Sequence, residues 1–214
     1  MSKSESDLFQ DERVLQHRSE RTGWDRFLTD AIYYGLGQII LLTFPIFWLL
    51  YQTPFIDIEA IAAGWATLVA LVIGIGFGRG GRLPINTSWP SLTNGMLGSA
   101  DGYRTYLSRA VYLSTTFMLG AYIGAYAAIW SGSLFVAPIV GGSIGLIAIL
   151  MLPTLLHENS SIAVARIGYN IVGLGVGIIG SSPFDIGVGD PTVGVVLLAV
   201  AICIYLDATY ILGT

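Results

Sequence analysis

The sequence predicts an all-α membrane protein, a bundle of six transmembrane helices with both termini in the cytoplasm. Of its 214 residues, 54% are hydrophobic and only 11% are charged, a composition far from that of soluble domains. Six separate stretches are mostly apolar over roughly 20 residues, the length that crosses a hydrocarbon core of about 30 Å. The third observation is the placement of the basic residues, which sets the orientation.

The six apolar stretches occupy most of the chain. They lie near residues 30–52, 58–78, 107–130, 134–156, 162–181 and 192–212. Residues 1–22 are polar, with too few apolar side chains to offset the ordering of a separate core, so we expect a flexible cytoplasmic tail. Residues 23–214 then form a single transmembrane domain.

The basic residues all fall on one side of this arrangement. All ten Lys and Arg residues lie before the first stretch, around the connection between the second and third stretches, or at the start of the fifth stretch. The opposite connections, at 53–57, 131–133 and 182–191, carry none. The positive-inside rule therefore places both termini in the cytoplasm. We expect the membrane that the protein spans to be the plasma membrane of the cell. Nine of the ten are arginine, which resembles proteins of salt-loving archaea and also suits a GC-rich genome.

Local signals support individual elements. Thr22-Gly-Trp-Asp25 has the spacing of a capping box ahead of the first stretch. Pro45, Pro138 and Pro153 lie inside stretches, where each removes a backbone donor and can bend its helix. The longest connection, 79–106, is rich in Gly, Ser, Asn and Pro, and we expect it to lie against the cytoplasmic interface. There Arg79 and Arg82 either contact anionic lipid headgroups or only fix the topology.

Glycine pairs at four-residue spacing predict where helices approach closely. Inside lipid, helix association depends on close packing at small residues and on interhelical polar contacts. The pairs are Gly74 and Gly78, Gly120 and Gly124, Gly141 and Gly145, and Gly173 and Gly177. Because the last three pairs lie toward the outer half of the membrane, we expect the third, fourth and fifth stretches to pack most tightly there.

Four ionisable residues, Asp30, Arg109, Arg166 and Asp207, share one level near the cytoplasmic ends of their stretches. A charge at membrane depth costs at least a few kcal/mol unless it is paired or hydrated, and arginine offers a planar fork suited to a carboxylate. We expect Asp207 to pair with Arg166 or with Arg109. The alternative is that each charge reaches the headgroups separately.

Other chemistry in the sequence is sparse. Gln38 and Asn170 are intramembrane polar residues that either line a solute path or join helices by hydrogen bonds. Cys203 is the one cysteine, and His157-Glu158 is too small a cluster for a zinc site, which needs at least three protein ligands. We therefore expect no cofactor, no metal and no enzymatic activity.

These features favour a small-solute or ion transporter, or the membrane subunit of a transport complex. The alternative is a structural or assembly protein that binds other membrane proteins, and an enzyme with an unrecognised site comes third. Expected partners are membrane lipids, with either other membrane subunits or a second copy of the chain. Nucleic acid is not an expected partner.

Overall fold

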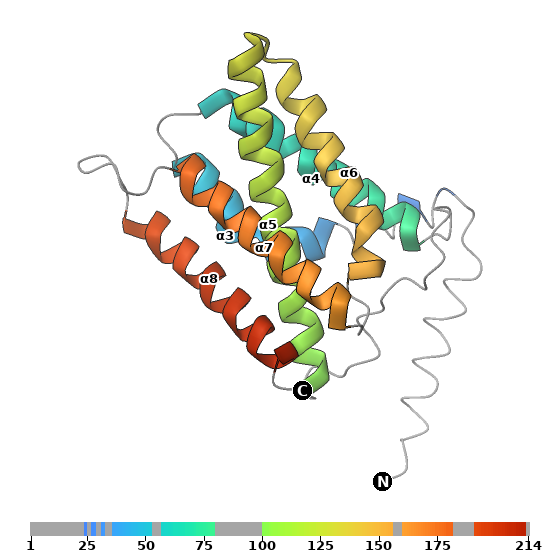
Figure 1. Cartoon of the computed structure of the whole chain (residues 1–214). Helices are drawn as coiled ribbons and strands as arrows, with labels where there is room; N and C mark the ends of the chain where they lie inside the picture. The colour runs from blue at the N-terminus through green and yellow to red at the C-terminus, as the bar shows by residue number, and fades with distance from the viewer. Residues whose placement is uncertain are drawn as a thin grey trace.

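The computed structural model describes residues 24, 27–28, 31–32, 36–52, 57–79, 100–155, 160–181 and 191–212, and all regular elements in this part of the chain are helical. The helices are α3 (Gly37–Gln52), α4 (Asp57–Arg79), α5 (Ala100–Ser131), α6 (Val136–Leu155), α7 (Ser160–Ser181) and α8 (Pro191–Leu212) (Figure 1). Five of the six, α4 to α8, are long and apolar enough to cross a membrane. The predicted all-helical, membrane-spanning class is confirmed at this level.

The first helix is shorter than the predicted stretch at 30–52. Ala31, Ile32 and Leu36 have π-helical geometry, and the regular helix α3 begins only at Gly37. The regular helix α3 has 16 residues and is about 24 Å long.

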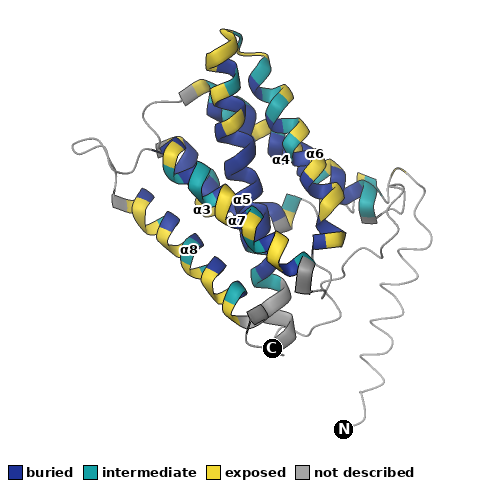
Figure 2. Cartoon of the chain, viewed as in Figure 1, coloured by how far each residue is buried: buried dark blue, intermediate teal, exposed yellow. Residues whose placement is uncertain are grey.

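Helix α5 is the centre of the bundle. It has 32 residues, or about 48 Å, and the other five helices all pack against it. Every residue from Val111 to Tyr122 is buried, whereas α8 keeps an exposed outer face (Figure 2). The helix starts at Ala100, so the predicted connection at 79–106 ends earlier than expected, and its residues 80–99 lie outside the described part.

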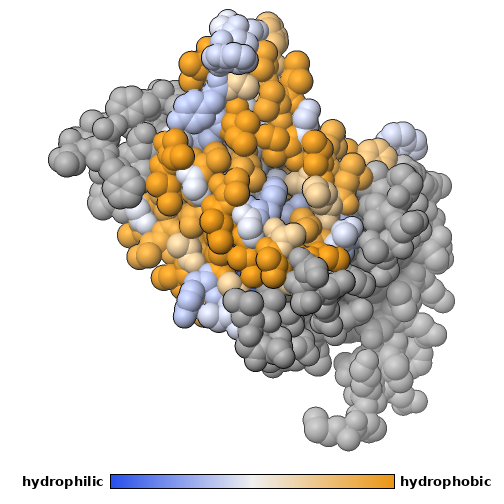
Figure 3. Space-filling view, in the orientation of Figure 1, coloured by the Kyte–Doolittle hydropathy of each residue, from blue (hydrophilic) through white to orange (hydrophobic). Residues whose placement is uncertain are grey.

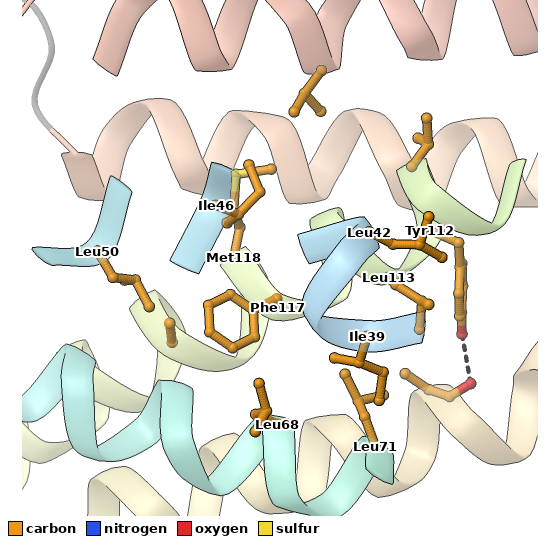
Figure 4. Packing of buried hydrophobic residues seen from close by; sticks show 14 of the residues in the cluster. Ile39, Leu42, Ile46, Leu50, Leu68, Leu71, Tyr112, Leu113, Phe117 and Met118 are labelled. Carbon is orange, nitrogen blue, oxygen red and sulfur yellow. Dashed lines mark hydrogen bonds between the residues drawn. The ribbon is translucent and has the colours of Figure 1, made fainter. Parts of the chain in front are cut away.

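Aromatic and long aliphatic side chains fill the space around α5. Tyr112, Phe117 and Met118 on this helix pack among Ile39 of α3 and Leu71 of α4, all fully buried (Figure 4). Because lipid tails are as apolar as these side chains, the gain on packing comes from dispersion contacts rather than from removal of water.

Glycines bring α4, α5 and α6 into backbone contact. A Cβ atom on Gly141 of α6 would lie 2.5 Å from the carbonyl oxygen of Ala63 on α4, and one on Gly145 would lie 2.9 Å from that of Thr67. On α5, a Cβ on Gly124 would come within 2.6 Å of the Ala63 side chain. The Thr67 hydroxyl also lies 2.9 Å from the Gly141 carbonyl oxygen, as an interhelical donor.

Helix α7 uses its glycines against α5. A Cβ on Gly173 would lie 2.6 Å from the Thr115 side chain, and Gly177 faces Met118. This differs from the expected close trio of the third, fourth and fifth stretches, because α6 and α7 meet only sparsely and the tight partner of α6 is α4. Sequence spacing predicts the level of a glycine along its helix, but it does not predict the neighbouring helix that the glycine faces. The other predicted glycines lie on α4 and α5: Gly74 against Ile149, Gly120 against Thr67, and Gly78 half-buried.

The outward surface of the bundle is apolar. Val195, Leu198, Ile202 and Tyr205 follow one another along the exposed face of α8, and the face of the described helices seen in Figure 3 is mostly hydrophobic. A surface of this kind suits contact with lipid tails rather than with water.

Candidate functional site: a buried ion pair and a polar column

An ion pair between Arg166 and Asp207 joins α7 to α8. It lies at the end of the bundle that holds the first residues of α5 and α7 and the last residues of α6 and α8. Nη2 of Arg166 lies 3.0 Å from Oδ1 of Asp207, and Nε lies 3.2 Å from Oδ2. The two side chains are only 5% and 1% exposed. This is the fork-shaped contact that a guanidinium makes with a carboxylate, the strongest kind of charged hydrogen bond in proteins.

Two further groups complete the charged cluster. The hydroxyl of Ser108 on α5 donates to Oδ1 of Asp207 over 2.5 Å, and Nη1 of Arg166 donates to the carbonyl oxygen of Leu155 over 3.2 Å. Leu155 is the last residue of α6, where carbonyls have no partner within the helix and the helix dipole is negative. The cluster therefore ties four helices together at one level.

The placement of the pair follows from antiparallel helices. Arg166 comes six residues after the start of α7, and Asp207 comes five residues before the end of α8. At 1.5 Å per residue, both lie about 8 to 9 Å from their helix ends. At that depth water does not solvate them freely, so each charge needs the other, together with the neighbouring hydrogen bonds, to offset the cost of burial.

A line of polar side chains continues from the ion pair along the contact between α5 and α7. On α5 the spacing i, i+4, i+7 and i+8 puts its members on one face. Thr116 Oγ1 lies 2.8 Å from the Tyr169 hydroxyl, and the rings of Tyr112 and Tyr169 are 5.0 Å apart between centroids. We call this set the polar column; it consists of Ser108, Tyr112, Thr115, Thr116, Arg166, Tyr169, Asn170 and Asp207.

Hydroxyls of α5 also reach carbonyls near the two prolines inside helices. The Tyr112 hydroxyl donates to the Ala148 carbonyl oxygen over 2.7 Å, dashed in Figure 4, one turn before Pro153. The Ser114 hydroxyl lies 3.1 Å from the Leu42 carbonyl oxygen, three residues before Pro45. A proline removes the helical donor of the carbonyl four residues earlier, which is that of Ile149 for Pro153 and that of Leu41 for Pro45. The two hydroxyls bond the carbonyls next to these, and side chains of neighbouring helices commonly support a proline-containing helix in this way in membrane proteins.

The far end of the column holds an unsatisfied amide. The Thr115 hydroxyl lies 2.9 Å from Oδ1 of Asn170, but also 2.8 Å from the carbonyl oxygen of Val111. It has a single proton to donate. Asn170 is fully buried and its Nδ2 has no hydrogen-bond partner. Turning the amide over lets Nδ2 donate to Thr115 but leaves Oδ1 without a donor, so in either orientation one polar atom of this buried amide lacks a hydrogen-bond partner.

The structure brings together some of the predicted site residues. Arg166 and Asp207 form one of the two pairs that the sequence allowed, and Arg109 is buried on α5 directly after Ser108. Asn170 lies in the polar column. Asp30 and Arg82 lie outside the described residues. Gln38 in α3 and Arg79 at the end of α4 belong to helices that the structure describes, but their side chains lie outside the description.

Sequence reasoning missed Ser108, Tyr112, Tyr169 and the Leu155 carbonyl as members of the site. A signal for the hydroxyls was present, because Ser108, Tyr112 and Thr115 recur every three to four residues on an otherwise apolar helix. The carbonyl carries no signal in the sequence. Among the described residues, no three His, Cys, Asp or Glu side chains gather as a metal site requires.

Fold and site together define a multi-pass membrane protein with a charged cluster buried between its helices. A family model described as a domain of unknown function, DUF8215, matches residues 21–159, about two thirds of the chain, and the protein belongs to this family. No curated protein and no solved structure matches it. The matched region contains Ser108 and Leu155, while Arg166 and Asp207 follow it on α7 and α8.

Proposed function

We propose that this protein is a transport component, either a carrier of a small polar solute or ion or the membrane subunit of a transport complex. The observation that carries the proposal is the polar column between α5 and α7, which begins at the Arg166 and Asp207 pair and ends at the buried, unsatisfied amide of Asn170. Buried polar groups inside a membrane are costly and commonly mark the paths of ions and solutes.

The column covers part of the membrane. From Ser108 to Thr116 it rises eight residues along α5, or about 12 Å, against a hydrocarbon core of about 30 Å. Beyond it, Gly177 lies against Met118 and closes the contact between α7 and α5. In this proposal the column is the half of a pathway that opens toward the arginine side, with the other half closed.

The orientation belongs to the same proposal. Arg109 and Arg166 lie near the same end of the bundle, while the α5–α6 turn at the opposite end carries no charge. The positive-inside rule then puts the arginine end and both termini in the cytoplasm of a cell with this protein in its plasma membrane. Cysteine at Ser133 in the α5–α6 turn should react with an impermeant thiol reagent on intact cells. Reaction only after the cells are opened would reverse this orientation.

We also propose that the protein is not an enzyme. The one hydroxyl in the cluster that contacts an acid, that of Ser108, donates to Asp207, whose charge is already engaged by Arg166. A nucleophile needs a free base beside it.

Cysteine accessibility tests the transport proposal. Thr116→Cys in the column and Ala125→Cys beyond the glycine contact replace two fully buried residues of the same helix, in a Cys203→Ala background. With the arginine side of membrane vesicles exposed to a small water-soluble thiol reagent, Thr116→Cys should react several times faster than Ala125→Cys. Equal protection of both cysteines would contradict a water-accessible column.

A structural or assembly role is the second candidate, favoured by the way the cluster engages its own members. Both carboxylate oxygens of Asp207 accept hydrogen bonds, and Arg166 donates from Nε, Nη1 and Nη2. Groups whose hydrogen bonds are made within the protein are suited to holding the helices together permanently. Two results together would favour this role over transport. The cysteine of Thr116→Cys would be unreactive, and a second membrane protein would co-purify with the full chain in stoichiometric amount. Lipids remain the expected surroundings in both cases.

A further inference from the structure

The tip of the α5–α6 hairpin carries two aromatic side chains with almost no cover. Trp130 is 92% exposed and Phe135 is 81% exposed, more than any other large apolar residue in the described part of the chain. The tip stands at the top of Figure 1, at the far end of α5 from the ion pair. Such exposure needs an explanation, because monomeric soluble surfaces rarely display paired aromatic residues in this way.

The turn that presents these rings is compact. Gly132 has a φ of 66°, a left-handed conformation that glycine adopts at no steric cost. Its N–H donates to the Ile129 carbonyl oxygen over 3.2 Å, and the Ser133 N–H donates to that of Ala128 over 3.1 Å. The rings are therefore held at fixed positions on either side of the turn.

Polarity is ordered along the hairpin from its apex. Ser131, Gly132 and Ser133 form a polar apex. The top of the molecule is pale above hydrophobic flanks in Figure 3. Trp130 comes next on one side of the apex, and Leu134 and Phe135 come next on the other; the exposed aliphatic Ile139 lies one turn further down. Residues 110–155 contain no charged side chain. From its apex the hairpin is polar, then aromatic, then aliphatic. This order matches the water, the headgroup region and the hydrocarbon core that follow one another along the normal of a bilayer.

The spacing to the arginines agrees with this order. Trp130 follows Arg109 by 21 residues on α5, a rise of about 31 Å, and a hydrocarbon core is about 30 Å thick. When Arg109 and the ion pair lie at one membrane surface, Trp130 and Phe135 reach the other. Tryptophan and other aromatic rings are enriched at that level of membrane proteins.

We propose that the α5–α6 tip is a membrane-interface anchor, with the rings of Trp130 and Phe135 lodged among the headgroups of the leaflet opposite the arginines. A protein partner fits less well. Two aromatic side chains bury about 150 to 250 Å² each, short of the roughly 800 Å² that each partner contributes to a stable interface, and the tip has no charged residue to form a polar rim. The inference holds whether or not the protein transports anything.

Spin labels along α6 measure the depth of the tip in the full-length protein. Phe135→Cys, Ile139→Cys and Ile147→Cys are labelled in a Cys203→Ala background and reconstituted in phosphatidylcholine vesicles; all three native side chains are exposed. Collisions with oxygen report lipid, and collisions with a water-soluble nickel complex report water. The ratio of oxygen to nickel collisions should rise in steps from 135 to 139 to 147, with 135 between the free label in buffer and position 147.

Two outcomes would overturn the anchor. A label at 135 that behaves like the free label places the tip in water, and a label shielded from both reagents places it under a second copy or another protein. Fluorescence gives an independent readout without cysteines. Lipid brominated near its headgroup should quench the intact protein more than the Trp130→Phe variant, whereas lipid brominated near its chain ends should quench both equally. Identical quenching by the headgroup-brominated lipid would likewise contradict the proposal.

Discussion

The guanidinium of Arg166 binds the carboxylate of Asp207 through two contacts, of 3.0 and 3.2 Å, between the two helices that are otherwise least buried in the bundle. Ser108 and the Leu155 carbonyl attach this pair to α5 and to the end of α6. Because the outer faces of α7 and α8 gain little from packing, the charged cluster is the strongest polar link between them and the rest of the protein.

Ser108→Ala should lower the free energy of unfolding by about 2 kcal/mol, because a hydrogen bond to a charged group contributes about 1.5 to 3 kcal/mol. The measurement is a denaturant titration in mild detergent. Ser143→Ala is the matched control, since the Ser143 hydroxyl bonds to its own helix on an exposed surface of α6. Equal losses in the two variants would mean that Ser108 does not support the ion pair.

Gly141→Ala should separate α6 from α4. The added methyl group would lie 2.5 Å from the Ala63 carbonyl oxygen, a backbone atom that cannot move aside, and overpacking of this kind costs about 1 to 3 kcal/mol. At Gly142, the next residue, a Cβ has its nearest neighbour 3.8 Å away. Thermal unfolding should therefore show a lower midpoint for Gly141→Ala and none of that loss for Gly142→Ala. The reverse order would mean that a different face of α6 packs against α4.

Gly173→Ala tests the contact between α7 and α5 in the same way. Its methyl group would meet the Thr115 side chain at 2.6 Å and the Thr115 backbone at 3.0 Å. Gly175, two residues further on, has open space around it. We expect Gly173→Ala to reduce stability by about 1 to 3 kcal/mol and to raise cysteine reactivity in the polar column, while Gly175→Ala changes neither. Unchanged stability in Gly173→Ala would rule out this close approach.

Tyr112→Phe removes the hydroxyl that donates to the Ala148 carbonyl oxygen. Hydrogen bonds between membrane helices contribute about 0.6 kcal/mol on average, with larger values near 1.7, so the loss should be about 1 kcal/mol in the denaturant titration. Tyr126→Phe alters an exposed tyrosine of the same helix and should be neutral. A neutral Tyr112→Phe would show that this carbonyl needs no second donor.

Much of the fold follows from the sequence, because length and apolarity decide which segments span a bilayer. The stretch predicted at 192–212 becomes α8 (Pro191–Leu212) almost unchanged. The first stretch was harder, since an apolar run does not reveal that regular helix begins only at Gly37. The positions of the two termini relative to the membrane stay a prediction.

The sequence indicates at which level along the helices the residues of the candidate site lie, but not the direction in which their side chains point. Arg109 and Arg166 both lie at the level of Asp207, and the choice between them depends on the rotation of each helix about its axis. The same holds for Gly141, whose close partner is Ala63 of α4, a helix outside the three that the sequence predicted to pack most tightly. Rotation is set by the sum of many packing contacts, which periodicity in one helix does not contain.

A double-mutant cycle on Arg166 and Asp207 tests the central claim, that this buried pair fastens α7 and α8 to the bundle. Unfolding free energies are measured for the wild type, Arg166→Met, Asp207→Leu and the double variant. Removing one partner of a buried pair costs about 3 to 5 kcal/mol because the other charge is left alone. We predict that the double variant loses about 3 kcal/mol less than the sum of the two single losses. Strictly additive losses would contradict the account.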